Sequence, residues 1–204
     1  IIVPMEASLK HVLRVHDADY VDLIRRVSER GGEYLDPDTY VARGTMKAAL
    51  IASGASIMGV DLLLEEGSTL FLSLTRPPGH HAGRRGKALG APTLGFCIFN
   101  NIAVAARYAM DVKKIRPIVI IDFDVHHGNG TEEIFWYESS VVCIDIHEHD
   151  IYPGTGNLED VGGGEAEGTK INVRLPARST DNDYIYVWKE IVEPLIHLVK
   201  PRLI

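Results

Sequence analysis

Hydrophobic and polar positions divide this chain into segments of two kinds. Apolar runs of strand length stand at 69–74, 117–122 and 141–146, and a more alternating run of the same length stands at 170–175. Continuous apolar runs are typical of strands buried on both faces of a parallel sheet. The intervening stretches carry apolar residues at helical spacing and predict helices at 17–30, 45–66, 97–110, 131–137 and 182–199. This order predicts an α/β protein, a three-layer α/β/α fold with a parallel sheet covered by helices on both faces.

Residues that commonly begin or end helices support these boundaries. Asp17 stands where it can cap the first helix, and Gly31-Gly32 and Gly67 stand where the first two helices should end. Residues 147–169 are rich in glycine and predict a long loop, while 201–204 resembles the start of another buried strand. One domain of 204 residues fits this plan.

A cluster of chemically active side chains follows the run at 117–121. The segment Asp122 to Gly130 reads DFDVHHGNG and releases acids, imidazoles and an amide at the end of a strand, where parallel sheets form ligand crevices. Asp124 and His126 can both reach one cation, and this oxygen and nitrogen pair suits Zn²⁺ or Fe²⁺. The alternative is a polar turn whose histidines bond to backbone carbonyls. We favour the metal, since a turn needs no such density of titratable groups.

A second cluster follows the run at 69–74. Its loop contains the adjacent pair His80-His81, preceded by Pro77-Pro78-Gly79, and proline restricts the freedom of such a loop. Imidazoles titrate near neutral pH, so two of them beside a metal-bound water could serve as general base and general acid. A His-His pair alone is weak evidence, but beside the first loop it indicates a catalytic site.

Composition narrows the class of protein. The formal net charge of −7 and pI near 5.7 argue against direct nucleic-acid binding and suit a cationic substrate. Cys97 and Cys143 lie in apolar segments, so we expect both to be buried and reduced. Without a leader or a run of eighteen apolar residues, we expect no membrane span and a cytoplasmic protein.

Four blocks of the sequence resemble the signatures of the histone deacetylase superfamily, which includes acetylpolyamine amidohydrolases and acetoin-utilisation proteins. The blocks stand in the family's order at residues 76–82 (RPPGHHA), 95–103 (GFCIFNNIA), 122–130 and 152–156 (YPGTG). The resemblance implies a zinc-dependent hydrolase that removes acetyl groups from amines such as acetyl-lysine or acetylpolyamine. It leaves the substrate and the oligomeric state open.

The same resemblance implies roles for individual residues. Asp124 and His126 would be metal ligands, and a third ligand, an Asp, does not occur in this chain. His80 and His81 would share the proton transfers, the first buttressed by Asp122 and the second by Asn129. Because a neutral amide supports an imidazolium less than a carboxylate does, His81 should be the less basic histidine. Asn at this position resembles the class II and bacterial members.

Further assignments follow from the resemblance. Gly95, Phe96 and Tyr152 would bind substrate, with the two rings lining the acyl-lysine channel. A structural K⁺ or Na⁺ site, built largely of backbone carbonyls, would be formed by Asp122, Asp124, His126, Asp145 and Ile146. His127 would be structural, and Asp36 and Asp38 would lie on a loop that grips the substrate backbone. The remaining histidines are read as loop residues near the pocket rim (His147 and His149) or as ordinary helix or surface residues (His11, His16 and His197).

Two alternatives remain. An arginase-type ureohydrolase would need Asp-x-His-x-Asp for two metals, whereas this chain has Asp-x-Asp-x-His, so that reading is less favoured. A non-catalytic or degenerate module is the stronger rival, because the family's third ligand and its catalytic Tyr are missing. We therefore read 1–204 as an incomplete deacetylase domain, which alone should be inactive and prone to associate.

Overall fold

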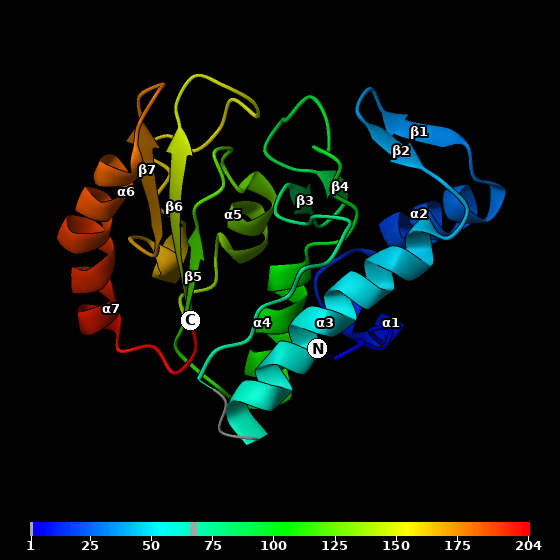
Figure 1. Cartoon of the computed structure of the whole chain (residues 1–204), viewed down its shortest axis with the longest axis horizontal. Helices are drawn as coiled ribbons and strands as arrows, with labels where there is room; N and C mark the ends of the chain where they lie inside the picture. The colour runs from blue at the N-terminus through cyan, green and yellow to red at the C-terminus, as the bar shows by residue number, and fades with distance from the viewer. Residues whose placement is uncertain (1, 66–68) are drawn as a thin grey trace.

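A computed structural model describes residues 2–65 and 69–204 of the chain (Figure 1). Its centre is a parallel sheet of three strands in the order β5-β6-β7, formed by Ile118–Asp122, Val141–Glu148 and Lys170–Leu175. Helix α5 (Asn129–Phe135) connects the first two strands. The register pairs Asp122 with Asp145, so both acids lie toward the carboxyl ends of their strands, on the same side of the sheet.

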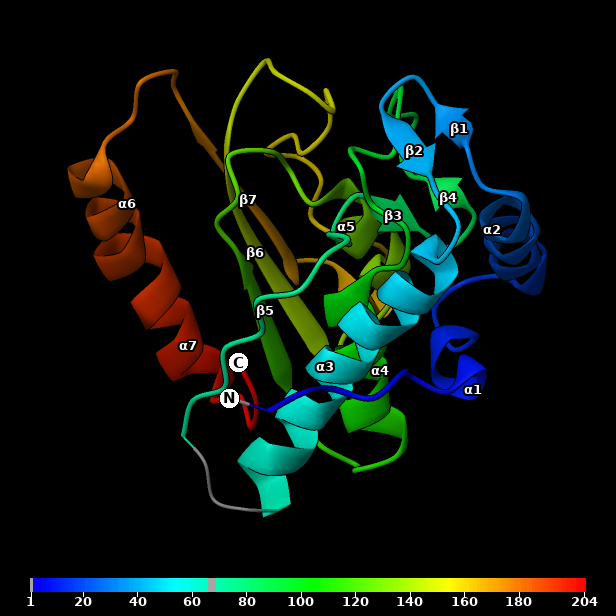
Figure 2. The same cartoon turned by 45° about the vertical axis from the view of Figure 1, so that its right-hand side comes forward.

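Helices cover both faces of this sheet, as predicted (Figures 1 and 2). One face packs against α3 (Thr45–Glu65), α4 (Asn101–Asp111) and α5, with Ile118, Ile120 and Phe135 in that core. The other face packs against a continuous helical segment made of α6 (Asp181–Val187), the π-helical turn η2 (Trp188–Val192) and α7 (Glu193–Val199). Val119 and Ile144 point to that second core. Alternate residues of one strand thus serve opposite layers.

Smaller elements surround this centre. The amino-terminal part contains α1 (Leu9–Val12) and α2 (Ala18–Arg30), followed by a hairpin of β1 (Glu33–Asp36) and β2 (Thr39–Val41). A second short hairpin consists of β3 (Ala82–Gly83) and β4 (Gly86–Lys87), directly after the paired histidines. The helical turn η1 (Gly164–Ala166) interrupts the loop before β7.

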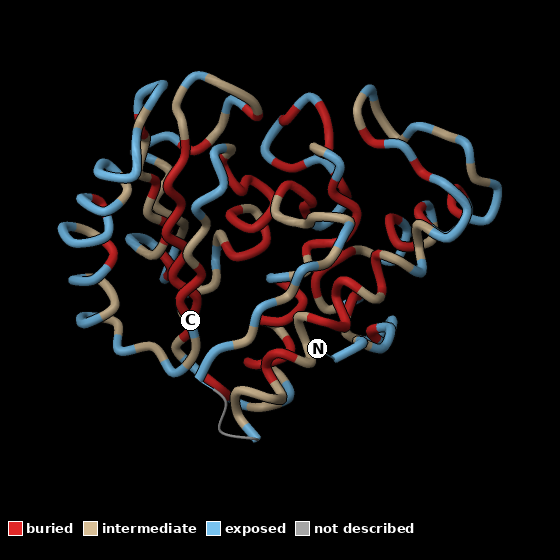
Figure 3. The backbone as a smooth tube through the Cα atoms, in the orientation of Figure 1, coloured by how far each residue is buried: buried red, intermediate tan, exposed pale blue. Residues whose placement is uncertain are grey.

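The apolar helix α3 belongs to the core. By length and composition alone it could cross a membrane. In the structure, however, Ala49 and Val60 are buried in two different hydrophobic clusters, where they pack with residues of α2 and α4. Figure 3 shows the side of this helix that faces the molecule as largely buried. Small residues allow the close approach: a Cβ at Gly54 would lie 1.9 Å from the carbonyl oxygen of Met5.

Several predicted boundaries are wrong. No strand forms at 69–74, where Leu70, Leu72 and Leu74 are exposed, because no described strand runs beside this segment to complete a ladder. The segment 201–204 contributes only one bridge, between Leu203 and Ile118.

Other differences are smaller. The helix predicted from residue 97 begins at Asn101, because the side chain of Asn100 accepts the backbone N–H of Ala103 and caps it. Asp17 occupies the N-cap position of α2 without a capping side-chain hydrogen bond, and its carboxylate pairs with Arg85 instead. The predicted stop at Gly67 lies outside the described residues, whereas Gly31 ends α2 as predicted.

His16 also departs from the prediction of an ordinary helix or surface residue. It is buried between the amino-terminal segment and the second hairpin, where its Nδ1 donates to the carbonyl of Gly83 at 2.9 Å. Its Nε2 accepts the backbone N–H of Asn100 at 2.9 Å. Because the second contact requires a lone pair on Nε2, the neutral imidazole fits this environment.

We expect His16 to make the fold sensitive to acid. Burial lowers the pKa of its imidazole to about 4, from an ordinary value of 6.5. The stabilisation by neutral His16 is therefore complete above pH 6.5 and is lost as the pH falls through about 4. Between pH 7.5 and 5 this should remove about 2 kcal/mol from the free energy of unfolding, measured by urea denaturation.

The replacement His16→Gln should flatten that pH dependence. His197→Gln is the matched control, because His197 is exposed on α7 and the substitution also removes one imidazole. An unchanged pH dependence in the His16 variant would contradict the assignment.

Candidate active site

Hydrogen bonds within the loop after β5 determine its shape. Asp122 is the last residue of that strand, and its Oδ1 accepts the backbone N–H of Asp124 at 3.1 Å. In turn, Asp124 Oδ1 accepts the backbone N–H of His126 at 2.8 Å and lies 3.2 Å from Nδ1 of the same imidazole. Asp residues favour such local turns because their short side chains reach the backbone two positions on. The turn therefore brings the carboxylate and the imidazole of the expected metal ligands together.

The two adjacent histidines are each held by a different kind of partner. His80 Nδ1 bonds to Asp122 Oδ2 at 2.8 Å, and His81 Nδ1 bonds to Asn129 Oδ1 at 2.8 Å. The amide of Asn129 donates to the carbonyl of Ala88, so its oxygen faces His81. His81 must then donate from Nδ1, and its neutral form carries a lone pair on Nε2.

These partners give the two imidazoles different pKa values. Burial, reinforced by the neighbouring His80, lowers the pKa of His81 to about 4. Burial also opposes protonation of His80, but the hydrogen bond and charge of Asp122 outweigh it, so the pKa of His80 is raised. His81 is thus the less basic of the pair, as predicted from the sequence. Burial opposes protonation of both imidazoles, and the carboxylate of Asp122, which has no charged counterpart at Asn129, makes the difference between them.

A pocket of about 440 Å³ gathers most of the predicted site residues. The ring of Tyr152 lies 4.9 Å from that of His81 and 5.7 Å from that of His126, measured between centroids. Its hydroxyl donates to the carbonyl of Thr93 at 2.9 Å, which fixes the ring. The lining consists of Asp38, Arg76, Pro78, His80, His81, Gly95, Phe96, Asp124, His126 and Tyr152.

Gly95 lies against the reactive edge of His81. Its φ is +53°, and a Cβ there would lie 2.4 Å from His81 Cδ2 and 3.1 Å from Nε2. The position therefore requires glycine for its backbone conformation and for its close approach to the imidazole. Phe96, the next residue, is 58% exposed and lines the mouth of the same pocket.

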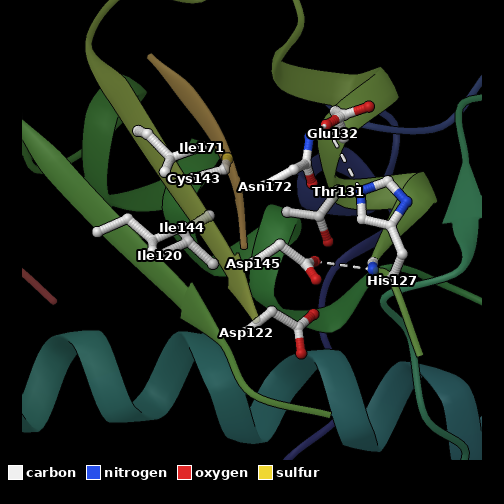
Figure 4. Close-up of a pocket in the computed structure, with 11 residues that line it drawn as sticks. Ile120, Asp122, His127, Thr131, Glu132, Cys143, Ile144, Asp145, Ile171 and Asn172 are labelled. Carbon is white, nitrogen blue, oxygen red and sulfur yellow. Dashed lines mark hydrogen bonds and ion pairs between the residues drawn. The ribbon is translucent and has the colours of Figure 1, made fainter. Parts of the chain in front are cut away.

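The residues proposed for a monovalent cation divide between two places. Asp122 and Asp145 line a small enclosed cavity of about 10 Å³, shown in Figure 4, whereas Asp124 and His126 line the open pocket. Asp145 Oδ2 accepts the backbone N–H of Gly128 at 2.8 Å, which ties β6 to the loop after β5. Ile146 is buried in the core on the other face of the sheet.

Several remaining predictions concern histidines and acids around the pocket. The prediction that His147 is a loop residue near the pocket rim is wrong. His147 lies in β6, is buried, and its Nδ1 bonds to Asp145 Oδ1 at 2.7 Å. His149 does lie in a loop, outside the pocket lining. His127 is buried beside Thr155, where a structural role would place it. The carboxylate of Asp36 accepts hydrogen bonds from backbone N–H groups, including that of Leu94.

Two comparisons identify the family and the fold. The sequence profile of the histone deacetylase domain matches residues 1–204. The chain belongs to the histone deacetylase domain family. The crystal structure of the HDA15 HD domain superimposes with a TM-score of 0.90 at 35% identity, covering 98% of this chain and 57% of that one. The fold of this deacetylase domain is therefore the one that the sequence predicted.

Curated relatives of this deacetylase domain include two archaeal proteins and one bacterial protein. An uncharacterized protein of Methanocaldococcus jannaschii is 50% identical over 98% of this chain and 57% of its own length. A probable deacetylase of Archaeoglobus fulgidus is 38% identical over 98% and 54%. A histone deacetylase-like amidohydrolase of Pseudomonas aeruginosa is 34% identical over 97% and 51%. The chain thus spans about half the length of these relatives.

Two of the expected metal ligands lie together in this deacetylase domain. Asp124 and His126 offer the oxygen and nitrogen donors that Zn²⁺ accepts, and both line the pocket. Within residues 2–65 and 69–204, no group of three His, Cys, Asp or Glu side chains is arranged to hold a metal ion. The donor chemistry therefore fits zinc, with two protein ligands from this chain.

Proposed function

We propose that this chain carries the proton-transfer and metal-binding side of an amidohydrolase that removes acetyl groups from amines such as acetyl-lysine or acetylpolyamines. The observation that supports it best is the pairing of two oppositely tuned imidazoles with Asp124 and His126 in one pocket. A pocket with convergent polar groups and perturbed pKa values is the usual setting for such chemistry.

The two histidines have different roles, and the proton transfers fall to His81. Zn²⁺ held by Asp124 and His126 would polarise the acetyl carbonyl and make water more acidic. His81 Nε2, kept unprotonated by burial, accepts a proton from the attacking water and then passes it to the leaving amine nitrogen. His80 is held by Asp122, which raises its pKa, so it is the imidazole of the pair that better supports a positive charge beside His81. Amide and water are thereby converted into acetate and free amine.

The walls of the pocket suit an acylated amine. Phe96 and Tyr152 would flank the aliphatic stem of the substrate, because ring faces bury methylene groups without a polar cost. Asp38 lies on the same lining and could accept a backbone N–H of a peptide substrate. These features favour a substrate whose amide nitrogen is carried by a linear alkyl chain over one with a bulkier chain.

A non-catalytic module is the second candidate, because the described residues supply only two metal ligands. Zinc binding tests the proposal. We expect the metal-free chain to bind one Zn²⁺, more weakly than a structural zinc site, in competition with a fluorescent chelator. Asp124→Ala and His126→Ala should each weaken binding by at least about 10-fold, since each removes a direct ligand.

The control is His197→Ala, which removes an exposed imidazole on α7. Zinc binding that is insensitive to Asp124 and His126 but lost in His81→Ala would overturn the ligand assignment. Absence of any bound zinc would favour the non-catalytic module.

A further inference from the structure

A lysine side chain is buried at the start of β7. Lys170 is 1% exposed and lies beside Cys143 of β6 in the register of the parallel sheet. Lysine is seldom buried this completely, because its ammonium group loses the water that hydrates its charge. The protein atoms around Nζ must therefore replace that hydration.

Three oxygen atoms surround Nζ. It donates to the carbonyl of Val141 at 2.9 Å and to Thr169 Oγ1 at 2.6 Å. It also donates to the carbonyl of Glu138 at 3.4 Å. The Thr169 hydroxyl gives its own hydrogen to the carbonyl of Ala166, so it can only accept from Lys170. Because all three neighbours are acceptors, Nζ needs three hydrogens, which the charged ammonium form provides.

These three neighbours are all neutral. The carboxylate of Glu138 is engaged elsewhere, since it accepts hydrogen bonds from Arg107 at 2.8 Å and from the backbone N–H of Ser140. An ordinary ion pair would instead place a carboxylate against the buried lysine. Carbonyl oxygens that replace a hydration shell are a means by which proteins hold K⁺. The oxygens around Lys170 are therefore of the kind that binds a monovalent cation.

The same oxygens come from separate parts of the fold. Glu138 lies between α5 and β6, Val141 begins β6, and Thr169 directly precedes β7. We infer that the Lys170 ammonium is a tethered substitute for a bound monovalent cation, which holds the turn before β6 against the start of β7. The chain thus supplies this cation itself, and removal of the ammonium should leave a site that K⁺ can fill.

Equilibrium unfolding in urea tests this inference in the natural full-length protein. Lys170→Ala removes the ammonium and leaves room for an ion among the three oxygens. With a dissociation constant of about 10 mM, about 100 mM KCl should raise the folding equilibrium constant of this variant about 10-fold. The reference is tetramethylammonium chloride at the same concentration, because that cation is too large for the vacated space. Propylammonium, which matches the lost part of the side chain, should also stabilise the variant.

The wild type and Lys170→Met serve as controls. The methionine side chain fills the space without a charge, so this variant should show no stabilisation by K⁺ beyond that of the wild type. Any K⁺ response of the cation site expected around Asp122 is common to all three proteins and cancels in this comparison.

Chemical labelling of the wild type gives a second readout, which does not depend on the folding of a variant. Reductive methylation should modify the exposed Lys189 and Lys200 and spare Lys170, as measured by mass spectrometry. Three results would overturn the inference: labelling of Lys170 at the rate of Lys189, equal K⁺ responses in Lys170→Ala and the wild type, or failure of Lys170→Ala to fold in KCl.

Discussion

Replacing His81 by Ala should lower turnover by roughly 10² to 10⁴-fold in the natural full-length protein. The imidazole is buried, its Nδ1 is fixed on Asn129, and its Nε2 edge adjoins Gly95 at the pocket. The measurement is kcat on an acetyl-lysine peptide, and KM should change far less because the stem of the substrate contacts other residues.

Two further measurements separate a proton-transfer role from a structural one. Added imidazole should restore part of the turnover of His81→Ala, since a small base can enter the vacated space. His197→Ala, which removes an exposed imidazole, should retain full turnover. Unchanged kcat in the His81 variant would exclude the proposed role.

Gly95→Ala should reduce turnover by roughly 10²-fold, the scale expected when a reacting group is displaced by about 1 Å. The new methyl group would meet His81 Cδ2 at 2.4 Å and the hydroxyl of Tyr152 at 2.9 Å, so the imidazole must move. The left-handed backbone adds a strain of about 1 kcal/mol to the folded state. Turnover and the free energy of unfolding are both measured.

Gly90→Ala provides the matched comparison. Gly90 has a φ of +77°, but a Cβ there would meet nothing within 4 Å. This variant should therefore show a similar backbone strain with nearly normal turnover. Equal losses of turnover in the two variants would mean that strain, rather than contact with His81, explains the effect.

The sequence predicted those parts of the fold that depend on local pattern. The apolar runs at 117–122 and 141–146 form strands of the parallel sheet, and their alternate residues enter two different cores. The run at 69–74 has the same apolar character, yet it forms no strand, because a strand requires hydrogen-bonding neighbours that a local pattern does not reveal.

Prediction of the site succeeded where residues adjoin in sequence and failed where they converge from afar. The pairs His80-His81 and Asp124-x-His126 were visible as motifs, and the structure places all four side chains on one pocket. The prediction for His147 failed because the last residues of β6 are polar and acidic, and such residues are not typical of a buried strand.

The pairing of Asp122 with Asp145 in the parallel sheet also limits where this protein can tolerate insertions and deletions. Side chains alternate between the faces of a strand, so removing one residue from β5 would reverse the direction of every side chain after it. Asp122 would then leave His80, and the loop bearing Asp124 would start from the opposite face. Point substitutions within β5 alter one contact each. A single-residue deletion there would dismantle the site as a whole, so natural variation in chain length should be confined to the surface loops.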